Sequence, residues 1–196
     1  MIGIVLAAGM GRRIGQPKAL LKLGDETFHA RAIRSFQKAE LDTILVVNAL
    51  VADSLPKAIA GEVRLVNPDP DQDGGMFSSV KLAVVAALAR GASGAILLPV
   101  DYPLVTSDDI RAVAAGLLAQ TAIVIPTNSG RRGHPVGIGR AAMLEIVSDP
   151  MLKTLRDVVR KDPTRVAEVP ASEGVLRGVN TQDELAQASD AGFSVN

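Results

Sequence analysis

The sequence predicts an α/β fold with a mixed, mostly parallel central sheet flanked by helices on both faces. Short β-branched runs alternate with longer amphipathic or Ala-rich segments, an order that indicates right-handed βαβ units. The short runs are almost continuously apolar, as expected for strands covered on both faces. The chain has 196 residues, 47% hydrophobic and 21% charged, and is expected to form a single globular domain over residues 1–196.

The expected elements follow this alternation from the N-terminus. Strands are predicted at residues 2–6, 43–47, 63–66, 95–98 and 122–125. Helices are predicted at about residues 27–39, 49–60, 77–89 and 107–119, with a closing helix near 183–191. Thr106 stands before Asp108 and Asp109 and is expected to cap the helix that starts at 107. After about Pro126 the rhythm is interrupted by a polar, glycine-rich stretch, TNSGRRGHPVGIG, which predicts an added antiparallel strand or a small subdomain.

Charge and composition exclude several classes of function. Lys plus Arg and Asp plus Glu number 21 each, so no overall field indicates binding to nucleic acid or to an anionic membrane. Aromatic residues make up 3%, with no Trp, which argues against stacking platforms for single-stranded nucleic acid. The lack of Cys excludes disulfides, thiolate metal sites and a Cys nucleophile. There is no apolar leader and no run of roughly 20 apolar residues, so we expect a cytoplasmic protein.

A glycine-rich loop follows the first predicted strand, which is where ligands commonly bind in open α/β sheets. The loop reads LAAGMGRRIGQPK. Its residues Gly9, Gly11 and Gly15 let the backbone approach a polyanion and point N–H groups at it. Arg13 and Lys18 add positive charge for phosphate oxygens.

Other sites built on glycine-rich loops fit this sequence less well. A dinucleotide site needs the spacing G-x-G-x-x-G and an acidic residue ending the second strand, whereas this loop has G-x-G-x-x-x-G and that strand ends in Val47 and Asn48. The Walker A pattern is absent, because Lys18 stands between Pro17 and Ala19. A surface loop with a few exposed cations is the remaining alternative.

The loop resembles the signature L-A-A-G-x-x-x-R-M-G-x-P-K of the MobA-like nucleotidyltransferase superfamily, which has a glycosyltransferase-A-like fold. Ile14 in place of Met is the clear departure. The likeness is greatest to the branch that contains molybdenum cofactor cytidylyltransferase, and later segments match in order over nearly all of the chain. The resemblance implies a Rossmann-like nucleotide-diphospho-sugar transferase fold. It also implies nucleotide-binding roles for Leu6, Ala7, Ala8, Gly9, Gly11, Arg13 and Lys18.

A lone carboxylate, Asp101, follows the strand predicted at 95–98 and lies between Pro99 and Pro103. We expect it at the carboxyl edge of the sheet, where the first loop also emerges. Mg²⁺ takes only one or two protein carboxylates and completes its shell with water and phosphate oxygens, so one Asp facing a triphosphate suffices. The resemblance implies that Asp101 binds this metal. The alternative is an Asp that forms a turn or caps a helix.

A second metal contact is expected in the segment RGVNTQD near the C-terminus. The resemblance places Asn180 at the position of this contact. Gly178 and Asn180 stand where cytidylyltransferase-like members often carry Asp. An amide oxygen can bind a hard cation, although it contributes no charge. The alternative is that Asn180 only caps the helix that follows.

A segment rich in glycine and serine, DGGMFSSVK, opens the helix predicted at 77–89. Gly75 would let the chain approach a nucleoside, while Ser78 and Ser79 would hydrogen-bond its base or sugar. The segment resembles the family's G-M-x-S-S-L, which lines the nucleotide pocket. Alternatively, one of the two serines caps the helix.

The segment GRRGHPV resembles the family's G-x-x-G-H-P-V near the acceptor substrate, which implies acceptor contacts from Arg132, Gly133, His134 and Pro135. A general base is not required, because a phosphate monoester has a second pKa of about 6 and is largely dianionic at neutral pH. We therefore expect His134 to orient the acceptor; a structural turn His is the alternative. Arg131 and Arg132 either attract an anionic acceptor or solvate the loop.

The predicted reaction is nucleotidyl transfer. An acceptor phosphate attacks the α-phosphorus of a nucleoside triphosphate and pyrophosphate leaves, with Arg13, Lys18 and Mg²⁺ on Asp101 as the catalytic groups. The resemblance implies CTP as donor and molybdopterin as acceptor, because L-A-A-G and Pro17-Lys18 look more like cytidylyl than guanylyl members. The alternatives are a guanylyltransferase using GTP and a sugar-phosphate nucleotidyltransferase. A nucleotide-binding regulatory module and an NAD-dependent oxidoreductase are the competing classes. The sequence leaves open whether an acceptor-enzyme partner protein takes part.

Overall fold

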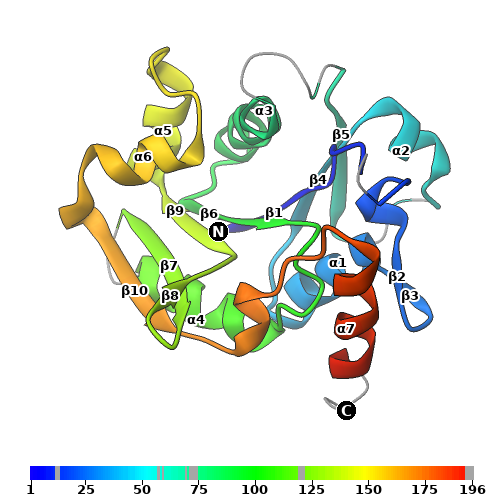
Figure 1. Ribbon diagram of the computed structural model, residues 1–196. Helices are drawn as coiled ribbons and strands as arrows, with labels where there is room; N and C mark the ends of the chain where they lie inside the picture. Colours follow the sequence, from blue (N-terminus) through cyan, green and yellow to red (C-terminus); the bar gives the residue numbers. More distant parts are fainter. Residues whose placement is uncertain are drawn as a thin grey trace.

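The computed structural model describes residues 1–11, 14–56, 58, 60–68, 70, 75–118 and 122–192 of the chain. An eight-stranded sheet lies at its centre (Figure 1). The strands are β1 (Ile2–Leu6), β4 (Thr43–Val47), β5 (Glu62–Val66), β6 (Gly94–Pro99), β7 (Ile123–Asn128), β8 (Arg131–Arg132), β9 (Val136–Gly139) and β10 (Val166–Pro170). Their order is β10-β7-β9-β6-β1-β4-β5, with β8 paired to β7. A separate two-stranded sheet joins β2 (Lys22–Leu23) and β3 (Glu26–Thr27).

Most strand pairs in the central sheet are parallel. β1 runs parallel to both β4 and β6, and the pairs β4–β5 and β7–β10 are also parallel. β9 is antiparallel to its neighbours β6 and β7, and β8 is antiparallel to β7. The predicted fold class is therefore confirmed. β9 is the antiparallel strand that the sequence predicts after Pro126.

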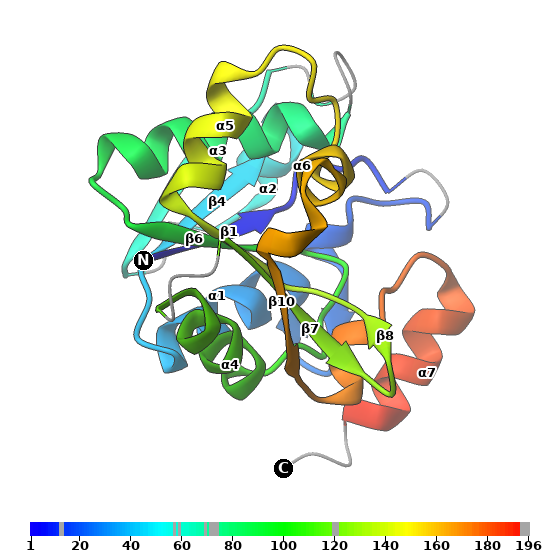
Figure 2. The ribbon, with the colours of Figure 1, turned by 90° about the vertical axis from the view of Figure 1, so that its left-hand side faces the viewer.

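Helices cover both faces of the sheet (Figure 2). They are α1 (Phe28–Lys38), α2 (Ala49–Ser54), α3 (Met76–Ala89), α4 (Ser107–Leu118), α5 (Arg140–Ser148), α6 (Leu155–Lys161) and α7 (Gln182–Gly192). Val5 of β1 packs in one hydrophobic cluster with α1 and α4, while its neighbours Ile4 and Leu6 belong to a second cluster with α3, α5 and α6. The strands are apolar throughout because each face contacts a helical layer. Within the described ranges, no helix has the length and apolar character needed to traverse a bilayer.

The structure corrects one predicted helix and adds elements that the sequence analysis does not contain. The helix predicted at 49–60 is wrong at its end, since α2 stops at Ser54. Leu55 is extended, with φ −82° and ψ 145°, because Pro56 disfavours the helical conformation of the residue before it. The additions include β2, β3, α5, α6 and β10. A capping box begins α6, in which Thr154 Oγ1 accepts from the N–H of Asp157.

The predicted cap of α4 is present and extends into a larger network. Thr106 Oγ1 accepts from the N–H of Asp109 at 3.2 Å. The Asp109 carboxylate is 3% exposed and accepts from the N–H and Oγ1 of Thr106 at 2.9 and 2.8 Å. It also accepts from the N–H and Oγ of Ser172, both at 2.8 Å. One carboxylate thus holds the C-terminal segment against the start of α4.

We expect Asp109→Ala to lower the free energy of unfolding by about 2–4 kcal/mol, because four donors lose a buried acceptor. Urea denaturation followed by circular dichroism measures the loss. Asp108→Ala is the matched control, because the Asp108 side chain is 87% exposed and pairs with Arg111 one helical turn away. Equal losses in the two variants would contradict a structural role for the Asp109 network.

Candidate functional site

The loop after β1 is fixed by its own backbone geometry and by one buried asparagine. Gly11 has φ +61°, and a Cβ there would lie 1.9 Å from the Gln16 carbonyl oxygen, so only glycine fits. Ile14 is buried in the core, which accounts for an apolar residue at this loop position. Asn48, directly after β4, donates its amide to the Ala8 carbonyl at 2.8 Å. Its Oδ1 also accepts from Val51 N–H and caps α2. Arg13, with Arg12, lies outside the described residues.

A cavity of about 250 Å³ opens beside this loop. Its lining comes from three segments that the sequence analysis singles out separately: the loop after β1, the start of α3 and the end of β6. Those lining residues are Leu6, Ala8, Gly9, Gly11, Lys18, Pro70, Gly75, Met76, Ser79, Pro99, Val100 and Asp101. The parallel strands β1 and β6 end at the same edge of the sheet, and this brings the segments together.

Lys18, Asp101 and Asn180 meet at one side of this cavity. The Lys18 ammonium donates to Asp101 Oδ2 at 2.7 Å and to Asn180 Oδ1 at 2.7 Å. Asp101 is held in turn by its carbonyl, which accepts from the N–H of Val179 at 2.7 Å. The carboxylate of Glu184 accepts from the N–H of Asn180 at 2.6 Å, and this contact lowers the pKa of Glu184. The two residues that carry these oxygens are therefore anchored through their backbones.

This geometry fits a hard divalent cation. A cationic nitrogen already lies at 2.7 Å from a carboxylate oxygen and from an amide oxygen, the ligand types that Mg²⁺ accepts. In the described part of the chain, no group of three or more His, Cys, Asp or Glu side chains is arranged for a metal. A site with one carboxylate and one amide suits a cation that shares its shell with phosphate oxygens and water. Asp101 and Asn180 are the residues that could hold it.

The serines at the start of α3 are not its caps. The N-cap is Gly75, at φ +61°, and no side chain caps the helix there. Ser78 Oγ donates to the Gly75 carbonyl at 2.9 Å. Both serine hydroxyls contact the amide of Asn67, at 2.8 and 2.9 Å. Gly75 and Ser79 line the 250 Å³ cavity, and among the described lining residues Ser78 is absent.

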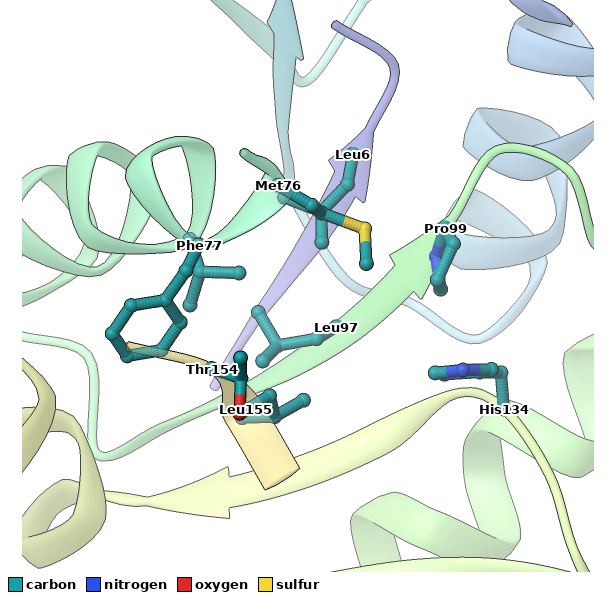
Figure 3. A pocket seen from close by; sticks show the side chains of 9 residues that line it. Leu6, Met76, Phe77, Leu97, Pro99, His134, Thr154 and Leu155 are labelled. Atoms are coloured by element: carbon teal, nitrogen blue, oxygen red, sulfur yellow. The ribbon is translucent and has the colours of Figure 1, made fainter. Parts of the chain in front are cut away.

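A second cavity, of about 100 Å³, adjoins the first and shares Leu6, Met76 and Pro99 with it. Figure 3 shows its walls converging from α3, β6 and α6, with the His134 imidazole at one side. The other lining residues are Phe77, Val80, Leu97, Thr154 and Leu155. The space is almost entirely apolar. Of the residues expected at the acceptor, His134 is the one among its described lining.

His134 is held by contacts with neighbouring elements, and its burial disfavours the charged form. Its backbone N–H donates to the Val175 carbonyl at 2.9 Å. The centroid of its ring lies 4.6 Å from that of the Tyr102 ring. Burial lowers the pKa of His134, while the charge of Asp101 acts weakly in the opposite direction. Its Nδ1 is buried, and no hydrogen-bond partner for it exists among the described residues. A Cβ on Gly133 would lie 2.2 Å from the Val175 carbonyl oxygen, so this turn needs glycine.

The other acceptor residues lie apart from the cavities. Arg132 is in β8, where its Nε pairs with Glu168 of β10 at 2.7 Å. Pro135 is buried directly before β9. Neither belongs to the described lining of the two cavities. Their acceptor roles therefore stay predictions.

Asn67, Met76 and the supporting role of Asn48 are not among the site residues that the sequence predicts. A signal for both asparagines exists in retrospect. Asn48 follows β4 and Asn67 follows β5, so both polar residues stand at carboxyl ends of neighbouring parallel strands. Met76 carries no such signal, because its position between two cavities depends on how α3 packs.

Comparison with known proteins decides the family. Residues 3–169 match the family model described as the MobA-like NTP transferase domain. The chain belongs to this family. A molybdenum cofactor guanylyltransferase of Rhizobium johnstonii is 30% identical over 95% of this chain and 90% of its own length. Another, from Rhizobium leguminosarum bv. trifolii, is 28% identical with the same coverage.

Solved structures share the fold of this nucleotidyltransferase. A homologue of Mycobacterium tuberculosis Rv0371c from Mycobacterium sp. strain JC1 gives a TM-score of 0.79 at 21% identity, covering 100% of this chain and 98% of its own. Rv0371c in complex with manganese gives 0.74 at 23% identity, covering 96% and 97%. The 2-C-methyl-D-erythritol 4-phosphate cytidylyltransferase of Thermus thermophilus gives 0.73 at 16% identity, covering 98% of each chain.

The relatives favour the guanylyl alternative over the cytidylyl reading that the loop motif suggested. Both rhizobial relatives, which match this nucleotidyltransferase over nearly their full length, are named guanylyltransferases. The physical reason lies in what the loop offers. Backbone N–H groups and a lysine charge are suited to phosphate and cannot distinguish one base from another. The motif from Leu6 to Lys18 therefore indicates the nucleotidyltransferase family and leaves the base undecided.

Replacing Lys18 tests whether the two oxygens form a cation site. We expect Lys18→Met to bind Mn²⁺, without nucleotide, roughly tenfold or more tightly than the wild type, because a competing positive charge is removed. Electron paramagnetic resonance of free Mn²⁺ measures the affinity. Lys22→Met, at an exposed position in β2, is the matched control. Unchanged or weaker Mn²⁺ binding in Lys18→Met would contradict the cation site.

Burial of His134 predicts a pH dependence of stability. The unfolded chain protonates this side chain as the pH falls below about 6.5, while the folded chain resists until its lower pKa is reached. Stability therefore falls with decreasing pH in this window, by at most about 1.4 kcal/mol per pH unit. His134→Gln should reduce the fall between pH 7.5 and 5.5 in urea denaturation. His29, whose pKa is also lowered by burial, keeps part of it. An identical fall in the variant would contradict this assignment.

Proposed function

We propose that this protein transfers a guanylyl group from GTP to the phosphate of molybdopterin and releases pyrophosphate. The observation that carries the proposal is the 250 Å³ cavity, whose lining brings together the glycine-rich loop with Lys18, Asp101 at the end of β6 and the start of α3. The names of the rhizobial relatives support both the nucleotide and the acceptor. We further propose that residues 1–196 act as one cytoplasmic domain, without nucleic acid or membrane as partners.

The triphosphate is assigned to the loop. N–H groups around Gly9 and Gly11 and the charge of Lys18 would contact its phosphates, and Arg13 is proposed to add a second charge. Asp101 and Asn180 would hold the divalent cation, for which we propose Mg²⁺; the manganese complex of Rv0371c supports a divalent ion in this fold. When bound, such a cation neutralises phosphate charge and polarises the phosphoryl group. Lys18, displaced from Asp101 and Asn180, would then pair with the phosphates.

The acceptor is assigned to the second cavity, beside His134. A phosphate oxygen of the acceptor attacks the α-phosphorus, a new phosphoanhydride bond forms, and the bond to the pyrophosphate leaving group breaks. The acceptor phosphate is largely dianionic at neutral pH, so no residue has to remove a proton from it. A neutral His134 fits this assignment, because Nδ1 and Nε2 then provide one donor and one acceptor for orienting the substrate. Gly133 and Pro135 would shape the turn, and Arg132 would attract the anion.

The first experiment is pyrophosphate release from GTP, CTP, ATP and UTP with Mg²⁺, each with and without molybdopterin and with a panel of sugar phosphates. We expect release from GTP that requires molybdopterin. Asp101→Ala should lower the rate roughly 100-fold or more, because charge stabilisation at the phosphates is lost. Asp108→Ala, far more exposed, should retain the wild-type rate.

Each other outcome has a defined meaning. Pyrophosphate release from CTP would support a cytidylyltransferase instead. Pyrophosphate release that requires a sugar phosphate would show that the acceptor is not molybdopterin. Binding of a triphosphate without turnover for any pair would contradict the enzyme and favour a nucleotide-binding module. An Asp101→Ala variant with full activity would remove Asp101 from the site.

A further inference from the structure

Asn67 connects the end of β5 to the first turn of α3. Its side chain is buried, with 5% of the residue exposed. The amide Nδ2 lies 2.8 Å from Ser78 Oγ and 2.9 Å from Ser79 Oγ. Its backbone N–H donates to the Val47 carbonyl at 2.7 Å, which continues the β4–β5 pairing by one residue. Asn67 is therefore anchored to the sheet and presents both hydrogens of its amide to two neighbouring hydroxyls.

The direction of these hydrogen bonds follows from the inventory of donors. Ser78 has one hydroxyl proton, which it donates to the Gly75 carbonyl at 2.9 Å. Toward Asn67 it can only accept, so the amide nitrogen rather than the oxygen faces the serines. Ser79 Oγ then also accepts from Asn67, and its own proton has no acceptor among the described hydrogen bonds. The amide of Asn67 thus donates a hydrogen bond to both serine oxygens.

The hydroxyl proton of Ser79 can point into the cavity. Ser79 is 2% exposed and lines the 250 Å³ cavity. It stands in the first turn of α3, where the helix dipole favours an electron-rich partner. The phosphates are assigned to a different part of the lining, the loop after β1 with Lys18. The nucleoside is the part of the ligand left for the α3 wall.

We propose that Asn67 is a positioning residue that makes the Ser79 hydroxyl a hydrogen-bond donor to the nucleoside. The subsite would then recognise an acceptor atom, such as a carbonyl oxygen or ring nitrogen of the base or an oxygen of the ribose. This inference rests on the proposed function only in that a nucleoside triphosphate occupies the cavity. It adds a residue, Asn67, that touches neither substrate and acts through Ser79.

The test is a double-mutant cycle on nucleotide affinity. Asn67→Asp keeps the shape but can only accept, so Ser79 must turn its proton away from the cavity. Isothermal titration calorimetry with GTP and Mg²⁺, without acceptor, measures the dissociation constant. We expect Ser79→Ala to weaken binding about tenfold, the value of one hydrogen bond, and Asn67→Asp at least as much. In the Ser79→Ala background the added charge alone remains, so the effect of Asn67→Asp should shrink at least threefold.

Controls separate this role from folding and from charge. Asn128→Asp makes the same change at an amide that donates to the Ala171 carbonyl at 2.8 Å, and it should bind GTP as the wild type does. Ser54→Ala, on α2, is the control for loss of a hydroxyl. Thermal unfolding of each variant shows whether it folds. Should Asn67→Asp fail to fold, Ser79→Ala still decides whether the hydroxyl contributes to GTP affinity. Titrations with 7-deaza-GTP and 2′-deoxy-GTP then test N7 and the 2′-oxygen as its acceptor, because the analogue that lacks the recognised atom should lose its sensitivity to Ser79→Ala.

The contradicting results are distinct. Wild-type GTP affinity in Ser79→Ala overturns the inference, as does an equal effect of Asn67→Asp with and without the Ser79 hydroxyl. Both leave the proposed function intact, since the wild type still binds GTP. Failure of the wild type to bind any nucleoside triphosphate would overturn the proposed function together with the inference.

Discussion

The contact of one ammonium with two oxygens organises the whole candidate site. Lys18 reaches Asp101 and Asn180, which are 83 and 162 residues away along the chain. Each of the three side chains follows a different part of the fold: the loop after β1, the end of β6 and the segment before α7. Each segment supplies one of the three groups in contact, so the arrangement depends on all three coming together. The site exists because the sheet brings β1 and β6 side by side and the C-terminal segment returns to them.

The contact of Lys18 with Asp101 and Asn180 adds little to the stability of the fold, but it defines the geometry of the candidate site. The side chains of Lys18 and Asp101 are 19% and 21% exposed, so solvent screens part of their attraction. The positions of Asp101 and Asn180 are instead secured through their backbones: the Asp101 carbonyl accepts from the N–H of Val179, and the N–H of Asn180 donates to the Glu184 carboxylate. Further support comes from Asp109, which holds the segment around Ser172 against α4. Stability and site geometry are thus supplied by different groups.

The neutral amide side chains of Asn48 and Asn67 support the candidate site at the ends of β4 and β5. Asn48 fixes the Ala8 carbonyl and caps α2, while Asn67 holds the two hydroxyls that open α3. A carboxylate at either position would lack the donors that these contacts need. It would also add negative charge beside a cavity assigned to a triphosphate. The amides at the ends of β4 and β5 are therefore suited to phosphate chemistry, in contrast to the acidic residue expected of a dinucleotide site.

Local pattern determined the elements that lie near the centre of the sheet. The runs at 2–6 and 43–47 coincide with β1 and β4, because a strand buried on both faces must be apolar at every position. The glycines of the first loop and Asp101 could also be recognised in the sequence. A φ of +61° at Gly11 favours glycine, and Asp101 is a lone carboxylate after a strand. The sequence alone thus indicated the fold class, the nucleotide loop and a carboxylate facing it.

Tertiary structure decided what depends on distant partners. β10 pairs with β7 across some forty residues of chain, and α5 and α6 contribute residues to the hydrophobic cluster on one face of the sheet. The join between the two cavities at Met76, the apolar surroundings of His134 and the bond from Asn67 to Ser79 arise from packing. The base remained undecided for the same reason: phosphate is recognised by a contiguous loop, whereas a nucleoside is recognised by walls that only the folded chain assembles.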